Sequence, residues 1–428
     1  MKQILLFGAG KSATCLIDYL IDNATSEQWH ITIADTNAGL ITAKTNHAAC
    51  TTAIELDIKD AAKRNDVIAA ADIVISMMPP ALHMLVAQDC LIAGKNLLTA
   101  SYVDEQLKTL APEIEKKGLL FLCEMGLDPG IDHMSAMQLI DQITANGGKI
   151  TAFKSHCGGL VAPESDDNPW HYKISWNPRN VVLAGNAGAE YKVNDTVKHI
   201  PYQSVFSNCE TIDISGLDSL AWYPNRDALS YIPIYKLEEA ATFIRTTLRH
   251  PAFCQAWNLL VAAQCTATND EDDLKKYENI TSWFSNKINA AGNDVEGATE
   301  MFRFLGLYDD LLIPPHCKTS ADILQYLLET RLVLHPNDKD MIVMKHEIDY
   351  VLDGKSKQIH SSLVVKGTDN VRTAMAKTVG LPLGIAAKLI LNGTIQLTGL
   401  HIPITKEIYK PVLNELSTHG IQFYENVI

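Results

Sequence analysis

Short apolar runs alternate with segments of helical spacing along the first 125 residues. Runs of this kind are typical of buried parallel strands, and they lie at residues 2–7, 30–35, 72–76, 96–99 and 118–122. Between the first two runs, apolar side chains recur at helical spacing, at Leu16, Ile17, Leu20 and Ile21. Strands that alternate with helices predict a doubly wound parallel sheet with right-handed crossovers.

The pattern changes near residue 150. Residues 149–157 alternate as an antiparallel strand does and precede a polar loop with two glycines, and further short strands are predicted at 180–184, 191–193 and 212–214. Residues 236–334 are mostly helical in spacing. A hairpin is predicted from 339–352 and 357–365, around the turn Asp353-Gly354-Lys355. Helices at 371–391 and 404–417 and a strand at 421–424 are expected after it.

These elements predict an α/β protein with more than one domain. At 428 residues the chain exceeds the size that a single hydrophobic core usually reaches. The first domain is expected at 1–130, and residues 371–400 are a candidate for completing it. A second, α+β domain with a mixed sheet is expected from 131–235 and 336–370 plus 401–428, with a helical insertion at 236–335.

Composition narrows the functional classes. The 36 Lys and Arg residues against 50 Asp and Glu give a net charge of −14, which disfavours nucleic acid as a partner. Nine cysteines without zinc-ligand spacing, and an N-terminus unlike a secretion signal, predict reduced thiols and a cytoplasmic protein. No apolar run reaches about 18 residues, so we expect no membrane span. We also expect no metal, because His133, His156 and His171 lack the spacing of a zinc site.

A glycine-rich loop follows the first predicted strand and opens the first predicted helix. In a G-x-G-x-x-A motif, the first glycine permits the tight turn and the second lets a pyrophosphate approach the backbone. A P-loop for nucleoside triphosphates requires glycine where this chain has Leu5, which excludes that motif. A strand–turn–helix without a ligand is the alternative. The motif predicts a Rossmann-type dinucleotide site at Gly8, Ala9, Gly10, Lys11 and Ser12.

Asp35 ends the second predicted strand, where a carboxylate can accept hydrogen bonds from both ribose hydroxyls of NAD. It would repel the 2′-phosphate of NADP by on the order of 4 kcal/mol, at about 4 Å and an effective dielectric of roughly 20. The next residues, Thr36 and Asn37, carry no charge to offset this repulsion. The sequence therefore predicts a preference for NAD over NADP, with a solvated turn residue as the alternative for Asp35.

Several longer motifs carry a family resemblance that covers nearly the whole chain. They are EMGLDPGIDH at 124–133, CGGL at 157–160, APE at 162–164, DNP at 167–169, YK at 172–173, SW at 175–176, YPNRD at 223–227 and IRTTLR at 244–249. In this order and spacing they resemble the glutamate-forming saccharopine dehydrogenases, also called saccharopine reductases, of lysine metabolism.

The resemblance implies a nicotinamide domain, a mixed-sheet domain for substrate binding and dimerisation, a helical region, and a homodimer. The implied reaction interconverts saccharopine with glutamate and 2-aminoadipate 6-semialdehyde through an imine, with hydride transfer to or from NAD or NADP. Beyond the glycine loop and Asp35, the expected cofactor-binding residues are Asp57, Ile58, Ser76, Met77, Leu127, Asp128 and Pro129.

Asp128 and Tyr102 are the candidates for proton transfer. In the family, the segment corresponding to 127–129 lies against the nicotinamide and the substrate, where a carboxylate can exchange a proton with the reacting amine. The alternative for Asp128 is a helix N-cap, because Asp-Pro before a helical segment is typical of one. Ser101 and Tyr102 follow a predicted strand end, and the resemblance places both at the substrate. The alternative for Tyr102 is packing on a helix.

Cys157 is the third catalytic candidate and precedes two glycines at the predicted end of a strand. Its functional interpretation is a thiol that positions the substrate, since hydride transfer needs no covalent role for it. A buried, inert cysteine is the alternative.

Arginines are the expected ligands of the substrate, because saccharopine carries three carboxylates that guanidinium groups can bind in bidentate fashion. A solvated turn charge is the alternative for Arg226, and an arginine that satisfies helix-end carbonyls is the alternative for Arg249. In an acidic chain, these arginines must create a locally positive pocket, to which Lys173 or Arg245 could add. The resemblance assigns the substrate to Arg226 and Arg249 together with Ser175, Thr247 and Leu248.

Two other functions stay open on the sequence. A related imine-reducing dehydrogenase, such as the carboxynorspermidine type, would use another amine donor, and the DNP and YPNRD segments favour saccharopine over it. A non-catalytic NAD(P) sensor on the same scaffold would bind the cofactor without turnover. The sequence does not indicate whether the reaction runs toward lysine synthesis or breakdown.

Overall fold

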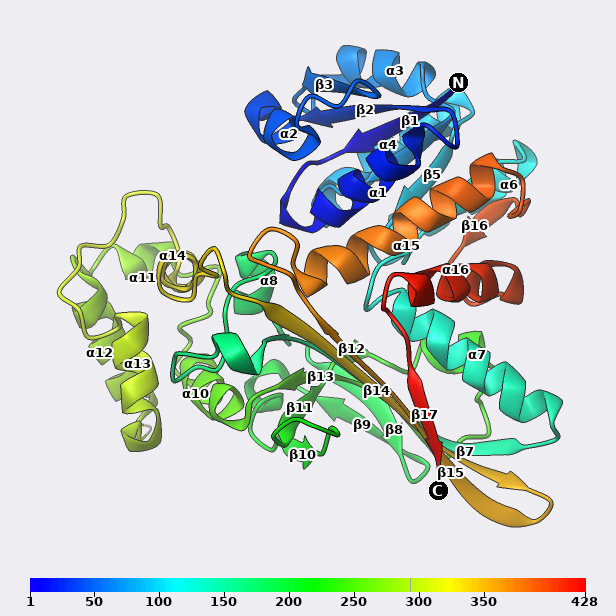
Figure 1. Ribbon diagram of the computed structural model, residues 1–428. Helices are drawn as coiled ribbons and strands as arrows, with labels where there is room; N and C mark the ends of the chain where they lie inside the picture. Colours follow the sequence, from blue (N-terminus) through cyan, green and yellow to red (C-terminus); the bar gives the residue numbers. More distant parts are fainter. Residues whose placement is uncertain (293) are drawn as a thin grey trace. The chain divides into compact units, whose positions relative to one another are not determined.

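The computed structural model describes residues 1–292 and 294–428, which divide into two compact units (Figure 1). Unit 1 contains Met1–Gln142 and Val371–Phe423, and unit 2 contains Ile143–Asn370 and Tyr424–Ile428. Each unit therefore combines segments that are far apart in the sequence. Residues 131–142 and 401–423, which the sequence pattern suggested for the second domain, lie in unit 1.

Unit 1 is built on a sheet of seven strands in which every neighbouring pair is parallel. Their order across the sheet is β16-β6-β5-β4-β1-β2-β3, so the chain changes direction between β1 and β4. In open sheets of this kind, ligands bind at such a switch point, outside the carboxyl ends of the strands. The sheet confirms the predicted doubly wound α/β fold. The strands are β1 (Lys2–Phe7), β2 (Trp29–Asp35), β3 (Thr51–Glu55), β4 (Ile73–Ser76), β5 (Asn96–Thr99), β6 (Leu120–Leu122) and β16 (Gly399–His401).

Helices connect these strands, and polar residues after the strand ends begin several of them. Asn37, Asp60 and Asp104 each accept a hydrogen bond from a backbone N–H in the first turn of the helix that follows. The helical elements are η1 (Lys11–Ala13), α1 (Thr14–Ala24), α2 (Ala38–Thr45), α3 (Ala61–Ala69), η2 (Pro80–Leu82), α4 (His83–Ala93), α5 (Glu105–Lys108), α6 (Ala111–Lys116), α7 (Ile131–Ala145), α15 (Ala374–Leu391) and α16 (Lys406–Thr418).

Helix α15 packs against α1, although the two lie more than 300 residues apart in the sequence (Figure 1). Two glycines permit the close approach, because a Cβ on Gly380 would lie 2.9 Å from the Leu16 amide nitrogen and one on Gly384 2.5 Å from Tyr19. By length and composition alone α15 could cross a membrane, but 72% of it is buried inside the protein. Its apolar character is accounted for by this packing.

Unit 2 is built on a ten-stranded mixed sheet with the main order β10-β11-β13-β7-β14-β15-β17. The central strand β7 pairs parallel with β13 and antiparallel with β14. Strands β14 and β15 form the predicted hairpin, in which Asp353 and Gly354 have positive φ as a tight turn requires. The strands are β7 (Lys149–Val161), β8 (Ala189–Val193), β9 (Thr196–Ile200), β10 (Glu210–Ile212), β11 (Leu220–Pro224), β12 (Arg226–Asp227), β13 (Thr242–Arg249), β14 (Asp340–Leu352), β15 (Lys355–Lys366) and β17 (Tyr424–Val427).

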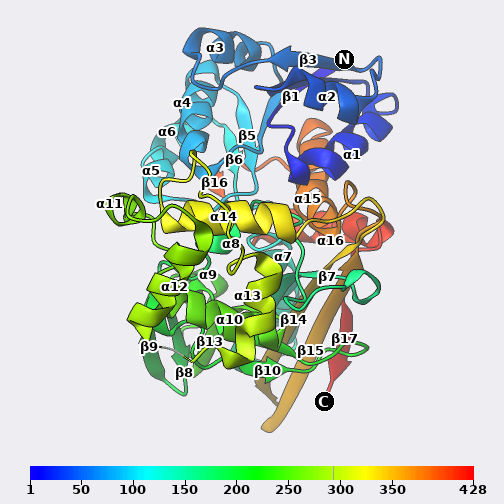
Figure 2. The same cartoon turned by 90° about the vertical axis from the view of Figure 1, so that its left-hand side faces the viewer.

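The helices of unit 2 pack around an aromatic core that contains the buried residues Trp170, Trp257, Trp283, Phe284 and Phe302. Figure 2 shows α12, α13 and α14 gathered on one side of the strands. The helical elements are η3 (Pro163–Ser165), α8 (Pro178–Val182), η4 (Tyr202–Ser204), α9 (Tyr231–Tyr235), α10 (Pro251–Ala262), α11 (Glu271–Leu274), α12 (Ile280–Ala291), η5 (Glu296–Ala298), α13 (Thr299–Leu305) and α14 (Ser320–Arg331).

Two predictions about strands in unit 2 are wrong. Most of the strand expected at 180–184 is helical, because Asn177 caps the backbone N–H of Arg179 and Pro178 starts the first turn of α8. Residues 242–249, inside a stretch expected to be helical, form the strand β13. Four of its eight residues are β-branched, which favours a strand over a helix.

The predicted end of strand β7 at Cys157 is also wrong, because β7 continues through both glycines to Val161. A Cβ on Gly158 would lie only 2.6 Å from the carbonyl oxygen of Leu248. The glycine therefore marks a close approach of β13 and not a loop.

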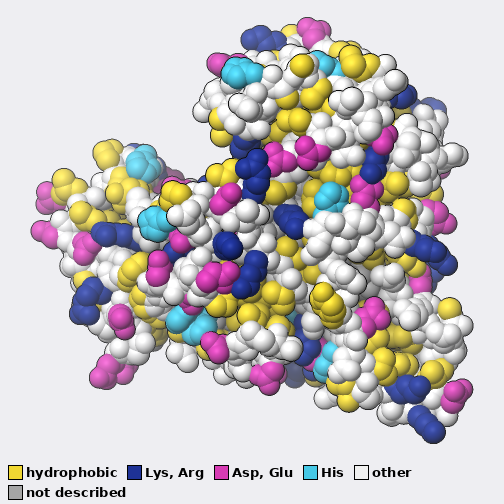
Figure 3. Space-filling view, in the orientation of Figure 1, with side chains coloured by type: hydrophobic (Ala, Val, Ile, Leu, Met, Phe, Trp, Pro, Cys, Tyr) yellow, Lys and Arg dark blue, Asp and Glu magenta, His cyan; other side chains and the backbone are white. Residues whose placement is uncertain are grey.

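Acidic and basic side chains are interspersed on the face of the molecule drawn in Figure 3. The formal charge of −14 is thus not gathered into one acidic patch on that face.

Candidate functional site

The glycine loop lies at the carboxyl end of β1, next to the switch point of the unit 1 sheet. Gly8 has a φ of +96°, and a Cβ there would lie 3.0 Å from the Met77 carbonyl oxygen, so only glycine fits without strain. Asp35, at the end of β2, accepts a hydrogen bond from the Ala9 N–H at 2.8 Å and another from the Asn37 N–H at 3.0 Å. The carboxylate thus holds the loop, and it is not merely the solvated turn residue of the alternative interpretation.

Gly10 leaves room for a ligand, because no described atom beyond its chain neighbours lies within 4 Å of the position that its Cβ would occupy. Its backbone does not need positive φ either, since φ is −63°. The missing side chain therefore leaves open space directly before η1 and α1. A pyrophosphate can approach the backbone closely there. The residues present are thus suited to a dinucleotide.

The other predicted cofactor residues follow the carboxyl ends of neighbouring strands. Because parallel strands end at the same edge of a sheet, residues after β3, β4 and β6 lie along one edge with the glycine loop. This edge carries Asp57, Ile58, Ser76, Met77, Leu127, Asp128 and Pro129.

A buried ion pair holds the loop that contains Asp57 and Ile58. Arg64 of α3 donates from Nε to the Asp89 carboxylate of α4 at 2.6 Å and from its guanidinium to the Ile58 carbonyl oxygen. Both side chains are largely buried. The pair therefore connects two helices to this part of the strand edge.

Tyr102 and Asp128 meet at the same edge, where the Tyr102 hydroxyl donates to the Asp128 carboxylate at 3.3 Å. The N-cap alternative for Asp128 is wrong, because α7 begins only at Ile131. Residues 126–131 form a tight loop instead, in which the Gly126 N–H bonds to the Pro129 carbonyl oxygen and the Asp128–Pro129 peptide is cis. The loop thus places the Asp128 carboxylate beside the tyrosine hydroxyl.

A buried cluster of three side chains supports this loop. His133 is fully buried, and its Nε2 lies 2.8 Å from the Glu124 carboxylate. The other oxygen of Glu124 accepts from the Val103 N–H at 3.1 Å, next to Tyr102. Asp132 accepts from the Gly130 N–H at 2.6 Å. Glu124 therefore connects the segment of Tyr102 to the helix that follows Asp128.

His83, the first residue of α4, lies among three hydroxyl groups. Its Nδ1 is 2.8 Å from Ser76 Oγ, its Nε2 is 2.7 Å from Ser101 Oγ, and Thr99 Oγ1 is 3.4 Å from both nitrogens. Burial lowers the pKa of His83 to about 4, against a smaller opposing effect of Asp104. The imidazole is therefore neutral at physiological pH.

In unit 2, Cys157 and Thr247 are direct neighbours across the parallel pair β7 and β13. Tyr223 of β11 pairs with Thr247 on the other side, so the three residues form a row across the sheet. Because successive side chains alternate between faces, Leu248 points away from this row. Its side chain is fully buried in an apolar cluster with Leu160, so only the Leu248 backbone is left for contact with a substrate on the face of Thr247.

Arg249 is a buried charged residue of unit 2 whose guanidinium is only partly hydrogen-bonded. It ends β13 and is 3% exposed, and its guanidinium lies over the rings of Tyr172 and Phe253 at 5.1 and 5.7 Å. It donates to the Leu248 carbonyl oxygen at 2.7 Å, but Nε has no hydrogen-bond partner in the described part of the chain.

No carboxylate pairs with Arg249 among the residues that the structure describes. A buried cation without a counter-ion is costly. The arrangement is therefore suited to an anionic ligand group. The helix-end alternative for Arg249 is wrong, since α10 begins after it, at Pro251.

The remaining substrate candidates differ in their surroundings. Ser175 is buried, and Arg226 is exposed with a φ of +52°. Lys173 does not add a free positive charge, because it pairs with Asp167 at 2.9 Å and with Asp338 at 2.7 Å. Arg245 is buried, with its guanidinium 4.5 Å from the centre of the Tyr231 ring.

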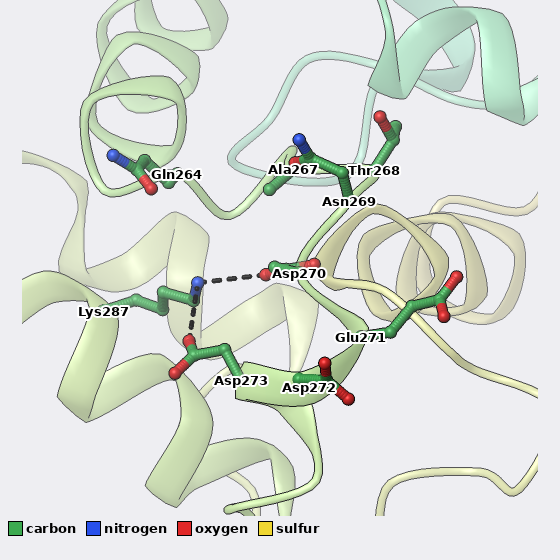
Figure 4. A pocket seen from close by; sticks show the side chains of 9 residues that line it. All are labelled: Gln264, Ala267, Thr268, Asn269, Asp270, Glu271, Asp272, Asp273 and Lys287. Carbon is green, nitrogen blue, oxygen red and sulfur yellow. Dashed lines mark hydrogen bonds and ion pairs between the residues drawn. The ribbon is translucent and has the colours of Figure 1, made fainter.

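A separate hollow of about 670 Å³ in unit 2 contains none of the predicted site residues (Figure 4). Lys287 lies between Asp270 and Asp273 at 3.0 and 3.2 Å and offsets part of the charge of the acidic lining. Asp270 also accepts hydrogen bonds from Ser320. These groups satisfy one another and have a structural role.

Sequence reasoning did not assign His83, Glu124 or His133 to the site. Glu124 could have been found, because it is a polar residue two positions after a predicted strand. His83 has no local signal, since it lies seven residues after Ser76 and 18 before Ser101. Only the pairing of β4 with β5 brings those two serines to one imidazole.

The parallel sheet, the glycine loop at its switch point and the Tyr102–Asp128 hydrogen bond at the same edge are suited to a dinucleotide-dependent oxidoreductase. Two family models cover almost the whole chain. The model for the saccharopine dehydrogenase NADP binding domain matches residues 4–122, and that for the saccharopine dehydrogenase C-terminal domain matches residues 126–421. The chain belongs to the saccharopine dehydrogenase family.

Individual relatives agree with this assignment. Saccharopine dehydrogenase [NADP(+), L-glutamate-forming] of Saccharomyces cerevisiae is 32% identical over 100% of this chain and 99% of its own length. Alpha-aminoadipic semialdehyde synthase of Arabidopsis thaliana is 31% identical over 99% of this chain, which spans only 44% of that longer protein. The solved apo structure of saccharopine dehydrogenase (L-Glu forming) from S. cerevisiae has a TM-score of 0.90, 32% identity and full coverage of both chains.

We predict that His83 makes the protein less stable in acid. The folded pKa of about 4 lies below the usual 6.5, so the unfolded chain binds more protons between these values and the free energy of unfolding falls as pH decreases. Urea unfolding at pH 7 and pH 5 should show wild type losing about 2 kcal/mol more than His83→Gln. Equal losses in both proteins would contradict the neutral, buried imidazole.

Proposed function

We propose that this protein interconverts saccharopine with glutamate and 2-aminoadipate 6-semialdehyde in lysine metabolism. The function rests on the full-length relationship to glutamate-forming saccharopine dehydrogenase. The structural observation that carries it is Arg249, a buried guanidinium that has no carboxylate partner in the described residues. A substrate with three carboxylates supplies the missing counter-charge.

The cofactor is NADP, as named for the matching domain family and for the yeast relative. These names do not support the preference for NAD that Asp35 suggested. In the structure, the Asp35 carboxylate accepts two backbone N–H groups, which stabilise its charge locally and give it a role in holding the loop. Residues 8–12 and the strand ends beside them would hold the dinucleotide. In its oxidised form, the dinucleotide would accept the hydride from the substrate carbon.

In the oxidative direction, saccharopine loses a hydride to the oxidised dinucleotide from the terminal CH₂ of its lysine-derived chain, next to the secondary amine. It also loses a proton from the nitrogen, which leaves an imine at that carbon. Water then adds to the imine carbon, and the carbon–nitrogen bond breaks to release glutamate and the aldehyde. The Asp128 carboxylate can accept the amine proton, and the hydrogen bond from Tyr102 orients it for this role. No metal is needed for these steps.

We also propose that the protein is a homodimer and that it is located in the cytoplasm. A homodimer follows from the family resemblance, and light scattering would test it as a mass of about twice the 47.1 kDa chain. A cytoplasmic location fits the nine cysteines, none of which is in a disulfide. The bovine relative carries the word mitochondrial in its name, so imaging of the tagged protein would decide the compartment.

An assay with saccharopine and oxidised cofactor tests the function directly. Reduced cofactor should accumulate with saccharopine and NADP, and glutamate should form in equal amount. Turnover of a different secondary amine, but not of saccharopine, would favour a related imine-reducing dehydrogenase. Cofactor binding without any turnover would favour a sensor, and either result would contradict the proposed reaction.

We predict that Arg249→Met weakens binding of the substrate and leaves binding of the cofactor unchanged. Loss of charge-assisted hydrogen bonds to one carboxylate should raise the KM for saccharopine by about 10- to 100-fold, while the Kd for NADPH stays unchanged. The free energy of unfolding should hold or increase, because the variant removes a buried charge that lacks a counter-ion.

Arg179→Met is the matched control for Arg249→Met. Arg179 lies in the same unit and pairs with Asp322 at 2.7 Å, so the control removes a paired guanidinium that is not assigned to the substrate. Its KM for saccharopine should equal that of wild type. An unchanged KM in Arg249→Met would remove Arg249 from the substrate site.

We predict that Asp35→Asn shifts cofactor choice toward NADP. Removal of one negative charge beside the expected ribose position lowers the repulsion on the 2′-phosphate. The ratio of kcat/KM for NADP to that for NAD should increase at least about tenfold over wild type. The same ratio in both proteins would show that Asp35 lies too far from the 2′-position to select the cofactor.

A further inference from the structure

His83 connects two strand ends of unit 1 through their hydroxyl groups. Ser76 ends β4 and Ser101 follows β5, and each hydroxyl oxygen lies within 2.8 Å of a different nitrogen of the imidazole. Ser101 is next to Tyr102, whose hydroxyl bonds to Asp128. The imidazole is therefore in contact with one serine of the proposed substrate site and with one deeply buried serine.

The two serines differ in exposure, and this difference selects one tautomer of the imidazole. Ser76 is 1% exposed, and His83 Nδ1 is the only side-chain hydrogen-bond partner of its hydroxyl in the described part of the chain. If Nδ1 carried the proton, the buried Ser76 proton would have no acceptor. If Nδ1 is the acceptor, Ser76 donates to it and the buried Ser76 hydroxyl is satisfied.

The neutral imidazole then carries its proton on Nε2. His83 donates that proton to Ser101 Oγ at 2.7 Å, so the Ser101 oxygen is the acceptor in this hydrogen bond. The Ser101 hydroxyl proton is consequently not used by His83. Because Ser101 is only partly buried, this proton can point toward a ligand at the edge of the sheet.

We propose that His83 is a positioning residue that fixes Ser101 as a hydrogen-bond donor toward the substrate. The inference deepens the proposed function, since it concerns how one serine of that site recognises an acceptor such as a carboxylate oxygen. His83 itself acts only through Ser101. The lowered pKa described above agrees with a neutral ring, and the geometry of the two serines decides which nitrogen holds the proton.

The tautomer can be measured without any substrate. In protein labelled with ¹⁵N-histidine, the His83 signals, identified by their loss in His83→Gln, should show a protonated Nε2 and an unprotonated Nδ1 at pH 7. Ser76→Ala removes the buried donor and should allow both tautomers to appear. A protonated Nδ1 or a charged ring in wild type would overturn the proposal, whether or not the protein turns over saccharopine.

A double-mutant cycle tests the action through Ser101. Ser101→Ala and His83→Asn should each lower kcat/KM for saccharopine by about tenfold, and the double variant should lose no more than either single variant. His83→Gln should recover part of the loss, because its amide can donate from about the position of Nε2. Additive losses would indicate a merely structural histidine and contradict the proposal.

His30→Asn is the matched control, because the His30 ring also bonds to a hydroxyl, Thr52 Oγ1 at 2.8 Å, on the same sheet. It lies near the amino end of β2, and its kcat/KM should equal that of wild type. If wild type does not oxidise saccharopine, the proposed function fails and the tautomer measurement still tests His83. If wild type is active and the cycle is additive, only the inference on His83 fails.

Discussion

The parallel pairing of the strands in unit 1 is the constraint on which its candidate site depends. Parallel strands end at one edge, so residues that follow β1, β2, β4, β5 and β6 come together without being close in sequence. The glycine loop, Asp35, Ser76, Tyr102 and Asp128 all owe their proximity to this geometry. Helix α15 supports it from a distant part of the chain, because its glycines permit close packing against the helix that begins after the loop.

Unit 2 contributes a different kind of chemistry. Its sheet holds Arg249 in a buried position among aromatic rings, with no carboxylate partner in the described chain. Burial of such a charge lowers the stability of the unit but increases the strength of any bond to an anionic ligand, since water no longer competes for the guanidinium. An acidic protein can thus offer a favourable position to an anionic group, because a desolvated cation dominates its immediate surroundings. Lys173, which belongs to a structural ion-pair network, cannot act in this way.

The sequence pattern was most successful where local signals agree with tertiary context. The alternating strands and helices before residue 125, the glycine loop and the turn at Asp353-Gly354 all have strong local chemistry, and the structure confirms the elements they predict. It failed at β13, where an aromatic and β-branched strand lies between helical segments, and at β7, where glycines suggested a loop. In both places the deciding factor is a neighbouring strand, since Gly158 is required by the approach of Leu248 and not by a turn.

For the site, the sequence by itself determined the types of residue and their motifs, and with them the family and the reaction class. Only the tertiary structure decided how these residues are used. Asp128 is not a helix cap because α7 begins three residues later, and the Leu248 side chain is excluded from the face of Thr247 by the alternation of the strand. The contact of His83 with Ser76 and Ser101 exists only because β4 and β5 are adjacent. Hydrogen bonds and burial depend on distances in space, which spacing along the chain does not contain.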